Sequence, residues 1–305
     1  MAKVKLSTKA VGSIVKIAVD GKDYDWLVVH QGLPGNVYDA SCNGTWLLMK
    51  DASAAKSRFG DGNGNSYKDS GIHTYLNNTF YSLIDSDIRN AIKQVKIPYQ
   101  NGTGSGGSLA TGSNGLSTKV FLLSGYEVGW TTSDNSSFPK DGVRLAYFGN
   151  SSGGNSKRIA YNGSSADNWW LRSPNTNHGS LVWGVKSDGS FNFWQHYNSI
   201  SVRPAFILPP TLVVSDDGTV STNTAPSTPG SISVPSSIMG GTNISISWAK
   251  SSDAESNLDG YKVERSTNGG SSWSQIYQGT ATSTTNNVAF GTTSVMYRVK
   301  AYDTE

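Results

Sequence analysis

The sequence predicts two domains rich in β-strands: a loop-rich α+β domain of short strands and two helices over residues 1–221, and an all-β sandwich over residues 230–305. The composition is the first reason, because 46 Ser, 34 Gly and 24 Asn residues favour turns and helix caps and exclude a helical bundle. The second is the 9 Trp, 14 Tyr and 9 Phe residues, which supply enough apolar surface for packed cores and exclude wholesale disorder. The third is the alternation of apolar and polar residues along the last part of the chain.

The first domain is expected to open with strands at 11–19 and 26–30, joined by a turn at Asp20-Gly21. Two helices should follow a third strand at 45–49. Ser70 can cap the first helix (70–81), and an apolar stripe marks the second (85–95). The Gly-, Ser- and Thr-rich stretch 101–115 is expected to be a surface loop. Further short strands are expected at 121–123, 144–148, 181–185, 191–194 and 202–208.

A stretch rich in Ser, Thr and Pro ends at Gly230 and marks the domain boundary, with the linker at 222–229. Beyond it, turn clusters such as Asn268-Gly269-Gly270 separate runs of alternating residues, as in a β-sandwich. The expected strands are 231–234, 243–248, 261–265 and 295–302.

This second domain resembles a fibronectin type III domain. The resemblance rests on Trp248 at the end of an early strand, Tyr261 at the start of the next, and the segment YRVKAYD that ends at Asp303. A fibronectin type III fold would need a seventh strand after that segment. We therefore expect the natural chain to be longer, or a strand to come from elsewhere, and we expect an exposed sheet edge.

The first domain resembles a family of phage and prophage tail-associated proteins whose heads are related to the C-type-lectin fold. The motifs are NWWLRSP (168–174) and VRPAFIL (202–208), supported by YDASCNGTWLL (38–48) and FLLSGYEVGW (121–130). In several members of this family, retroelements diversify the segment before the last strand by mutating template adenines. The resemblance implies a display scaffold whose tip contacts a host surface.

The residues between these two motifs independently suggest a binding face. Large amphipathic rings mixed with short polar side chains give contact area at a low cost in conformational entropy. Alternation past a turn at 186–189 is expected to place Phe191 and Phe193 toward the core, and Asn192 and Trp194 toward a ligand. The alternative is that the rings pack against the loops 101–115 and 149–165. The candidate ligand-binding residues are Asn175, Asn177, His178, Ser180, Trp183, Asn192, Trp194, His196, Tyr197 and Asn198.

Four further residues are expected to support this face from within: Trp169, Trp170, Arg172 and Arg203. The two tryptophans belong to a compact apolar run that suits a buried strand. The two arginines are expected to be half-buried and to donate hydrogen bonds to loop carbonyls. Their alternative role is to bind an acidic glycan or a phosphate.

The sequence favours neither a metal site, nor a cofactor, nor an enzyme. Asp61-Gly-Asn63-Gly-Asn65 resembles the start of a calcium loop, but Ser66 and Ile72 stand where such a loop needs Gly and Glu, so a polar turn is expected. The four histidines lack metal-ligand spacing, and Cys42 is expected to be a buried, inert thiol.

The charge distribution limits the partners. Residues 1–210 carry 20 Lys and Arg against 14 Asp and Glu, whereas residues 211–305 carry 5 against 8. Since no basic run interleaves with aromatic residues, we expect no nucleic-acid partner. No segment approaches the roughly 18 apolar residues of a membrane span, and no secretion signal is visible, so we expect assembly in a host cytoplasm.

Together these features predict a phage or prophage tail-tip protein in the virion, which recognises a host cell-surface protein or glycan through a possibly hypervariable face (175–198). Other tail or baseplate proteins, and copies of the same chain, are further expected partners. Two alternatives remain: a structural baseplate or fibre subunit, and a bacterial surface adhesin or carbohydrate-binding accessory module.

Overall fold

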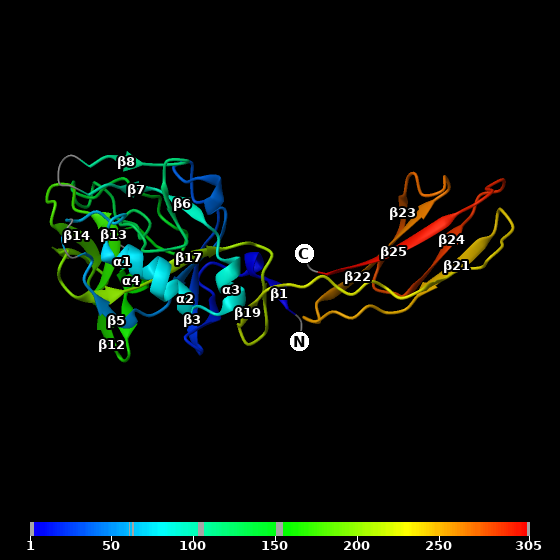
Figure 1. Cartoon of the computed structure of the whole chain (residues 1–305), viewed down its shortest axis with the longest axis horizontal. Coiled ribbons are helices and arrows are strands. Elements are labelled where there is room, and N and C mark those ends of the chain that lie inside the picture. Colours follow the sequence, from blue (N-terminus) through cyan, green and yellow to red (C-terminus); the bar gives the residue numbers. More distant parts are fainter. Residues whose placement is uncertain (1–2, 61, 63, 103–106, 151–154, 304–305) are drawn as a thin grey trace. The chain divides into compact units, whose positions relative to one another are not determined.

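The computed structural model describes residues 3–60, 62, 64–102, 107–150 and 155–303 (Figure 1). Its internal contacts divide the chain into two compact units, one of Leu6–Thr222 and one of Asn223–Glu305 with Met1–Lys5. The expected linker begins where the division falls, but its first residue is anchored in the second unit. Asn223 exchanges side-chain hydrogen bonds with Asn257 and Asp303, so this segment is packed rather than a free connector.

A five-stranded antiparallel sheet in the order β10-β17-β4-β3-β2 forms one layer of the first unit. Its first hairpin turns at Asp20 and Gly21, both with positive φ (51° and 70°), which is the geometry that Asp-Gly hairpin turns adopt. The strands are β2 (Ile14–Val19), β3 (Lys22–Gly32), β4 (Gly44–Met49), β10 (Val120–Phe121) and β17 (Ala205–Leu208).

A second five-stranded sheet, in the order β15-β14-β13-β16-β5, carries the predicted binding segment. The expected strand 202–208 is divided between the two sheets, because Arg203-Pro204 interrupts it and a proline cannot donate a ladder hydrogen bond. The strands are β5 (Ser53–Ser57), β13 (Trp169–Pro174), β14 (Leu181–Val185), β15 (Phe191–Gln195) and β16 (Ile200–Val202).

The helices are short. The predicted helix at 70–81 forms as a continuous run of α1 (Gly71–Tyr75), a π-helical turn (Leu76–Phe80) and α2 (Tyr81–Leu83), and the Ser70 side chain caps it by accepting a hydrogen bond from the His73 amide (Figure 1). The second, α3 (Ser86–Ala91), ends before the predicted Val95, because the backbone extends at Ile92 and Val95 joins a strand. A fourth, α4 (Asn155–Arg158), was not predicted.

The predicted strand at 144–148 is wrong. Leu145 and Phe148 are buried three residues apart, which is the spacing of a turn rather than the alternation of a strand. The predicted loop 101–115 contains a short strand in its described part. The remaining short elements are β1 (Val4–Lys5), a 3₁₀ turn at Leu6–Thr8, a second at Ala40–Cys42, β6 (Val95–Ile97), β7 (Tyr99–Gln100), β8 (Leu109–Ala110), β9 (Leu116–Thr118), β11 (Ala160–Asn162), β12 (Ser165–Asp167), β18 (Val213–Val214) and β19 (Val220–Ser221).

The second unit consists of two three-stranded antiparallel sheets, β20-β21-β24 and β23-β22-β25. Trp248 and Tyr261 pack edge to face at 5.5 Å between ring centroids and form its core with Ile246 and Val263. As predicted, β25 lies at a sheet edge within the described part of this unit. The strands are β20 (Ile232–Ser233), β21 (Asn243–Trp248), β22 (Leu258–Ser266), β23 (Ser274–Gly279), β24 (Ser283–Asn287) and β25 (Met296–Asp303).

The described chain is therefore mostly β-sheet with few helices. None of the helices in its described ranges has both the length and the apolar character that crossing a membrane requires.

Candidate functional site

The predicted binding segment is built on the hairpin of β14 and β15. Its turn closes where Lys186 and Gly189 hydrogen-bond across it, and Gly189 takes the left-handed conformation (φ 79°). Strand register places Trp183 opposite Phe193, and Val182 opposite Trp194. Paired residues in an antiparallel sheet share a face, so each face of the hairpin carries one of these aromatic pairs or contacts.

The face of Trp183 turns toward the core. Trp183 stacks on Phe138 at 4.0 Å between centroids and contacts Phe191 at 5.6 Å. Phe193 is on this same face at 5.3 Å from Trp183, but 40% of it is exposed because it lies near the end of an edge strand. The prediction that Phe193 faces the core is therefore only half correct, and its ring belongs to the accessible surface.

The opposite face carries Trp194. This ring meets Trp170 edge to face at 6.0 Å and lies over Gly184. A Cβ on Gly184 would come within 2.7 Å of the Trp194 ring and within 2.7 Å of the Trp169 carbonyl oxygen, so the glycine is what permits this packing. Trp194 is consequently half-buried, with one part of the ring held by the domain and the rest accessible.

One buried side chain outside the segment holds the loop between β13 and β14. The Asn65 amide nitrogen Nδ2 donates to the carbonyls of Asn175, His178 and Leu181 at 3.0, 3.0 and 2.8 Å. The sequence analysis considered Asn65 only as part of a polar turn, whose Asp61 and Asn63 lie outside the described residues. No sequence signal links it to a loop more than 100 residues away.

The loop after β15 is fixed in a similar way. The His196 ring nitrogen Nδ1 lies 2.8 Å from the Gly60 carbonyl oxygen, and the His196 carbonyl accepts from the Phe59 amide at 2.8 Å and the Gly60 amide at 3.2 Å. The His196 amide in turn donates to the Ser180 carbonyl. Tyr197 projects from this braced loop and is 53% exposed. The loops at 175–180 and 195–198 thus meet beside residues 59–60.

Eight of the ten predicted ligand-binding residues are accessible there: Asn177, His178, Ser180, Asn192, Trp194, His196, Tyr197 and Asn198. Two predictions are corrected. Trp183 has no exposed surface because its ring completes the cluster with Phe138, and Asn175 is 2% exposed because its side chain accepts from the Asn177 amide. Neither side chain can contact a ligand directly.

Against known proteins, the chain gives one informative match. A family model described as a domain of unknown function, DUF6273, matches residues 43–210, which is more than half of the chain. The chain belongs to the DUF6273 family. No curated protein matches it. Among solved structures, a crystal structure of titin domains matches at 19% sequence identity, covering 42% of this chain and 44% of the titin chain with a TM-score of 0.26. The chain thus spans less than half of that titin structure.

A fully buried ion pair stabilises the DUF6273 domain beneath the hairpin. Arg172 binds Glu127 through two hydrogen bonds of 2.6 and 2.7 Å, and its remaining donors reach the carbonyls of Pro98, Leu122 and Asp141. Glu127 also accepts from the Tyr38 hydroxyl at 2.8 Å. The guanidinium has no exposed surface, so Arg172 cannot bind an external glycan or phosphate.

Arg203 and the two supporting tryptophans of the DUF6273 domain are also structural. Arg203 donates to the carbonyls of Met49 and Lys50, and its guanidinium lies 4.8 Å from the Trp169 ring centroid. Trp170 donates to the Ser57 carbonyl. The predicted bonds from both arginines to loop carbonyls are confirmed, but both residues are fully buried rather than half-buried.

Asp141 is a second buried carboxyl beside this ion pair. Its Oδ2 atom accepts from the Ser173 hydroxyl at 2.8 Å, while its Oδ1 atom is buried without a hydrogen-bond partner in the described structure. Burial raises the pKa of Asp141 to about 7, although the Arg172 charge acts in the opposite direction. Asp141 therefore binds a proton in the folded domain at pH values where it is ionised in the unfolded chain.

This pKa shift predicts a pH dependence of stability. Between an ordinary aspartate value of 3.8 and about 7, the folded state holds a proton that the unfolded state releases, so the contribution of Asp141 to stability falls as pH rises through this range. Denaturant unfolding of the wild-type chain and of Asp141→Asn, measured from pH 4 to 8, should therefore diverge, with the variant becoming relatively more stable toward pH 8. Parallel pH curves for the two proteins would contradict the shift.

The described residues of the DUF6273 protein contain no group of three or more His, Cys, Asp or Glu side chains placed to hold a metal ion. Cys42 is buried, as predicted, and its thiol donates to the Lys96 carbonyl at 3.3 Å. Burial raises the pKa of this thiol to about 12, so almost none of it is the reactive thiolate at neutral pH. The accessible face at 177–198 thus offers rings, amides and imidazoles for non-covalent contacts.

Proposed function

We propose that this DUF6273 protein is a phage or prophage tail-tip protein that binds a host cell-surface ligand through the accessible residues between Asn177 and Asn198. The supporting observation is a group of exposed and half-exposed rings on a rigid base. Phe193 and Tyr197 project outward, Trp194 lies half-buried between strands, and the loops that carry them are held by hydrogen bonds from Asn65 and His196.

This arrangement suits tight recognition for a physical reason. Rings with few rotatable bonds provide contact area at a low cost in conformational entropy, and loops that are already fixed lose little further freedom when a ligand binds. Asparagine and histidine side chains between the rings supply adaptable hydrogen-bond donors and acceptors. Assembly of several copies in a particle would raise the effective affinity of weak single contacts.

The finer fold assignment is part of the same proposal. The first unit is a C-type-lectin-like head, on the motifs around Trp169 and Pro204, and the second is a fibronectin type III module that acts as a spacer or a secondary adhesion unit. The paired three-stranded sheets and the Trp248–Tyr261 core support the second assignment. A diversifying retroelement would act on the segment that carries the accessible face.

The test is a pair of substitutions in the particle. We expect Phe193→Ala together with Tyr197→Ala to leave particle yield unchanged and to reduce adsorption to host cells by about tenfold or more, because central aromatic contacts are often worth over 1 kcal/mol each. Particles would be induced from the bacterium that carries the gene, counted by electron microscopy, and assayed on cured cells of the same strain.

Tyr161→Ala is the matched control, because Tyr161 is a similarly exposed tyrosine (46%) on a different hairpin. Loss of particles in the double variant would favour a structural baseplate or fibre subunit instead. The absence of this chain from induced particles would contradict the tail assignment. A near-copy of codons 168–206 beside a reverse-transcriptase gene, differing mainly at adenines, would establish diversification of this face.

A further inference from the structure

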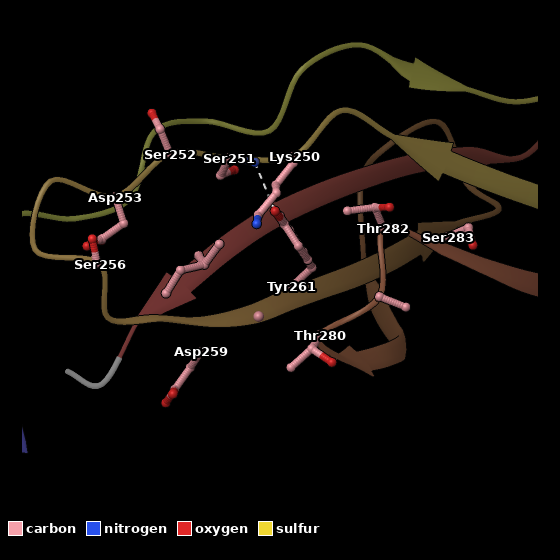
Figure 2. Close-up of a pocket in the computed structure, with 13 residues that line it drawn as sticks. Lys250, Ser251, Ser252, Asp253, Ser256, Asp259, Tyr261, Thr280, Thr282 and Ser283 are labelled. Carbon is pink, nitrogen blue, oxygen red and sulfur yellow. Dashed lines mark hydrogen bonds between the residues drawn. The ribbon is translucent and has the colours of Figure 1, made fainter. Parts of the chain in front are cut away.

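The second unit contains a cavity of about 840 Å³ at one end of its sandwich (Figure 2). Three segments line it: the loop 250–256 after β21, the first residues of β22, and the segment 280–283 before and into β24. Figure 2 shows the Tyr261 side chain rising between these segments, with its hydroxyl accepting a hydrogen bond from the Ser251 amide at 2.9 Å.

Two polar atoms in the wall of this cavity are buried without a hydrogen-bond partner in the described structure. One is the Ser251 hydroxyl oxygen, on a residue that is only 5% exposed, and the other is Oδ2 of Asp253. The other carboxylate oxygen of Asp253 is occupied, because it accepts from the amides of Glu255 and Asn257. A buried polar atom without a partner is costly, so such atoms beside a cavity indicate a group that can bond them.

The rest of the lining is rich in hydroxyls and nearly balanced in charge. Lys250 lies on one side, and the carboxylates of Asp253 and Asp259 lie on others (Figure 2). The ammonium disfavours a cationic ligand, and the two carboxylates disfavour an anionic one. The remaining hydroxyl groups at the cavity belong to Ser252, Ser256, Thr280, Thr282 and Ser283.

We propose that this cavity binds a neutral saccharide. Sugar hydroxyls both donate and accept, which matches a wall in which the Ser251 hydroxyl can do either and Asp253 Oδ2 can only accept. A peptide would need apolar pockets for its side chains, and Leu258 and Ala281 are the main aliphatic side chains in the lining. The site lies wholly within the second unit, so this proposal does not depend on the proposed function of the 177–198 face.

The substitution Ser251→Ala separates a binding role from a structural one. It removes an oxygen that has no partner in the described structure, so it should leave the thermal stability of the chain unchanged or slightly higher. If a sugar hydroxyl bonds this oxygen, the same substitution should weaken saccharide binding by about tenfold. A residue kept only for structure would not show this combination.

The experiment uses the whole 305-residue chain. Saturation-transfer NMR and calorimetry would be run with glucose, galactose, mannose, N-acetylglucosamine and their β-linked and α-linked oligosaccharides. Ser251→Ala and Asp253→Asn are the test variants. Ser271→Ala is the control, because Ser271 is an exposed serine in the β22–β23 turn, outside the cavity lining.

We expect at least one saccharide to bind the wild-type and Ser271→Ala chains, and to bind both test variants about tenfold more weakly with unchanged melting temperature. Absence of binding across the panel would overturn the proposal. So would binding that both test variants retain in full, since the sugar would then lie elsewhere. Binding of an extended peptide at this cavity in place of every sugar would assign it to a different ligand class.

Discussion

Replacement of Glu127 by Gln is expected to lower the free energy of unfolding of the first unit by roughly 3–5 kcal/mol, which is the range for removing one partner of a buried ion pair. The substitution keeps the shape of the side chain but leaves the Arg172 guanidinium charged and unpaired in a region with no exposed surface. The hydrogen bond from the Tyr38 hydroxyl would also lose its charged acceptor. Urea titration followed by tryptophan fluorescence measures this loss, because the first unit contains several buried tryptophans.

The chain offers a matched control for this effect. Glu264 pairs with Arg298 at the same 2.6 Å distance, but both side chains are substantially exposed to solvent. Since water screens an exposed pair, Glu264→Gln should produce no measurable change in stability. Equal effects from Glu127→Gln and Glu264→Gln would show that burial of the first pair has no energetic consequence, contrary to the prediction.

Asn65→Asp should cost roughly 3 kcal/mol or more, because each buried hydrogen-bonding group left without a partner costs about 1–3 kcal/mol. Aspartate has almost the same shape as asparagine, but it has no N–H group to donate to the carbonyls of Asn175, His178 and Leu181. It would also place a carboxylate oxygen against those three carbonyl oxygens. Thermal unfolding measures the loss, and hydrogen exchange should show faster exchange of the loop amides.

Asn114→Asp is the control for this substitution, because it makes the same chemical change at an exposed turn. We expect its melting temperature to match that of the wild-type chain. If Asn65→Asp melted at the wild-type temperature and the amides at 175–181 kept their protection, the three hydrogen bonds would not be what holds the loop.

Local signals in the sequence were sufficient for many elements. Asp20-Gly21 specified a hairpin turn, and Ser70 specified the start of a helix, because both depend on the backbone of near neighbours. Alternation was sufficient for β14 and β21, where burial follows one face of a strand. It failed at 144–148, because the contacts that bury Leu145 and Phe148 come from distant segments and not from a neighbouring strand.

The site was predicted in outline but not in its details. Composition located the accessible segment, yet it could not separate Trp183 from Trp194, because the same residue type serves both core and surface. What decides between them is Phe138, which is distant in sequence and stacks on Trp183. The partners Asn65 and Glu127 were missed for the same reason, since single polar residues carry no local signal of a contact made far along the chain.

The attachment of the loop at 175–181 has a consequence for how this protein can evolve. Asn65 grips that loop only by backbone carbonyls, which every amino acid possesses. Its grip is therefore indifferent to the side chains at Asn177 and His178, and mutation there can alter the chemistry of the tip without altering its shape. A fastener outside the changing segment allows many surfaces to be sampled on one framework, and a single position, Asn65, has to stay constant to preserve that freedom.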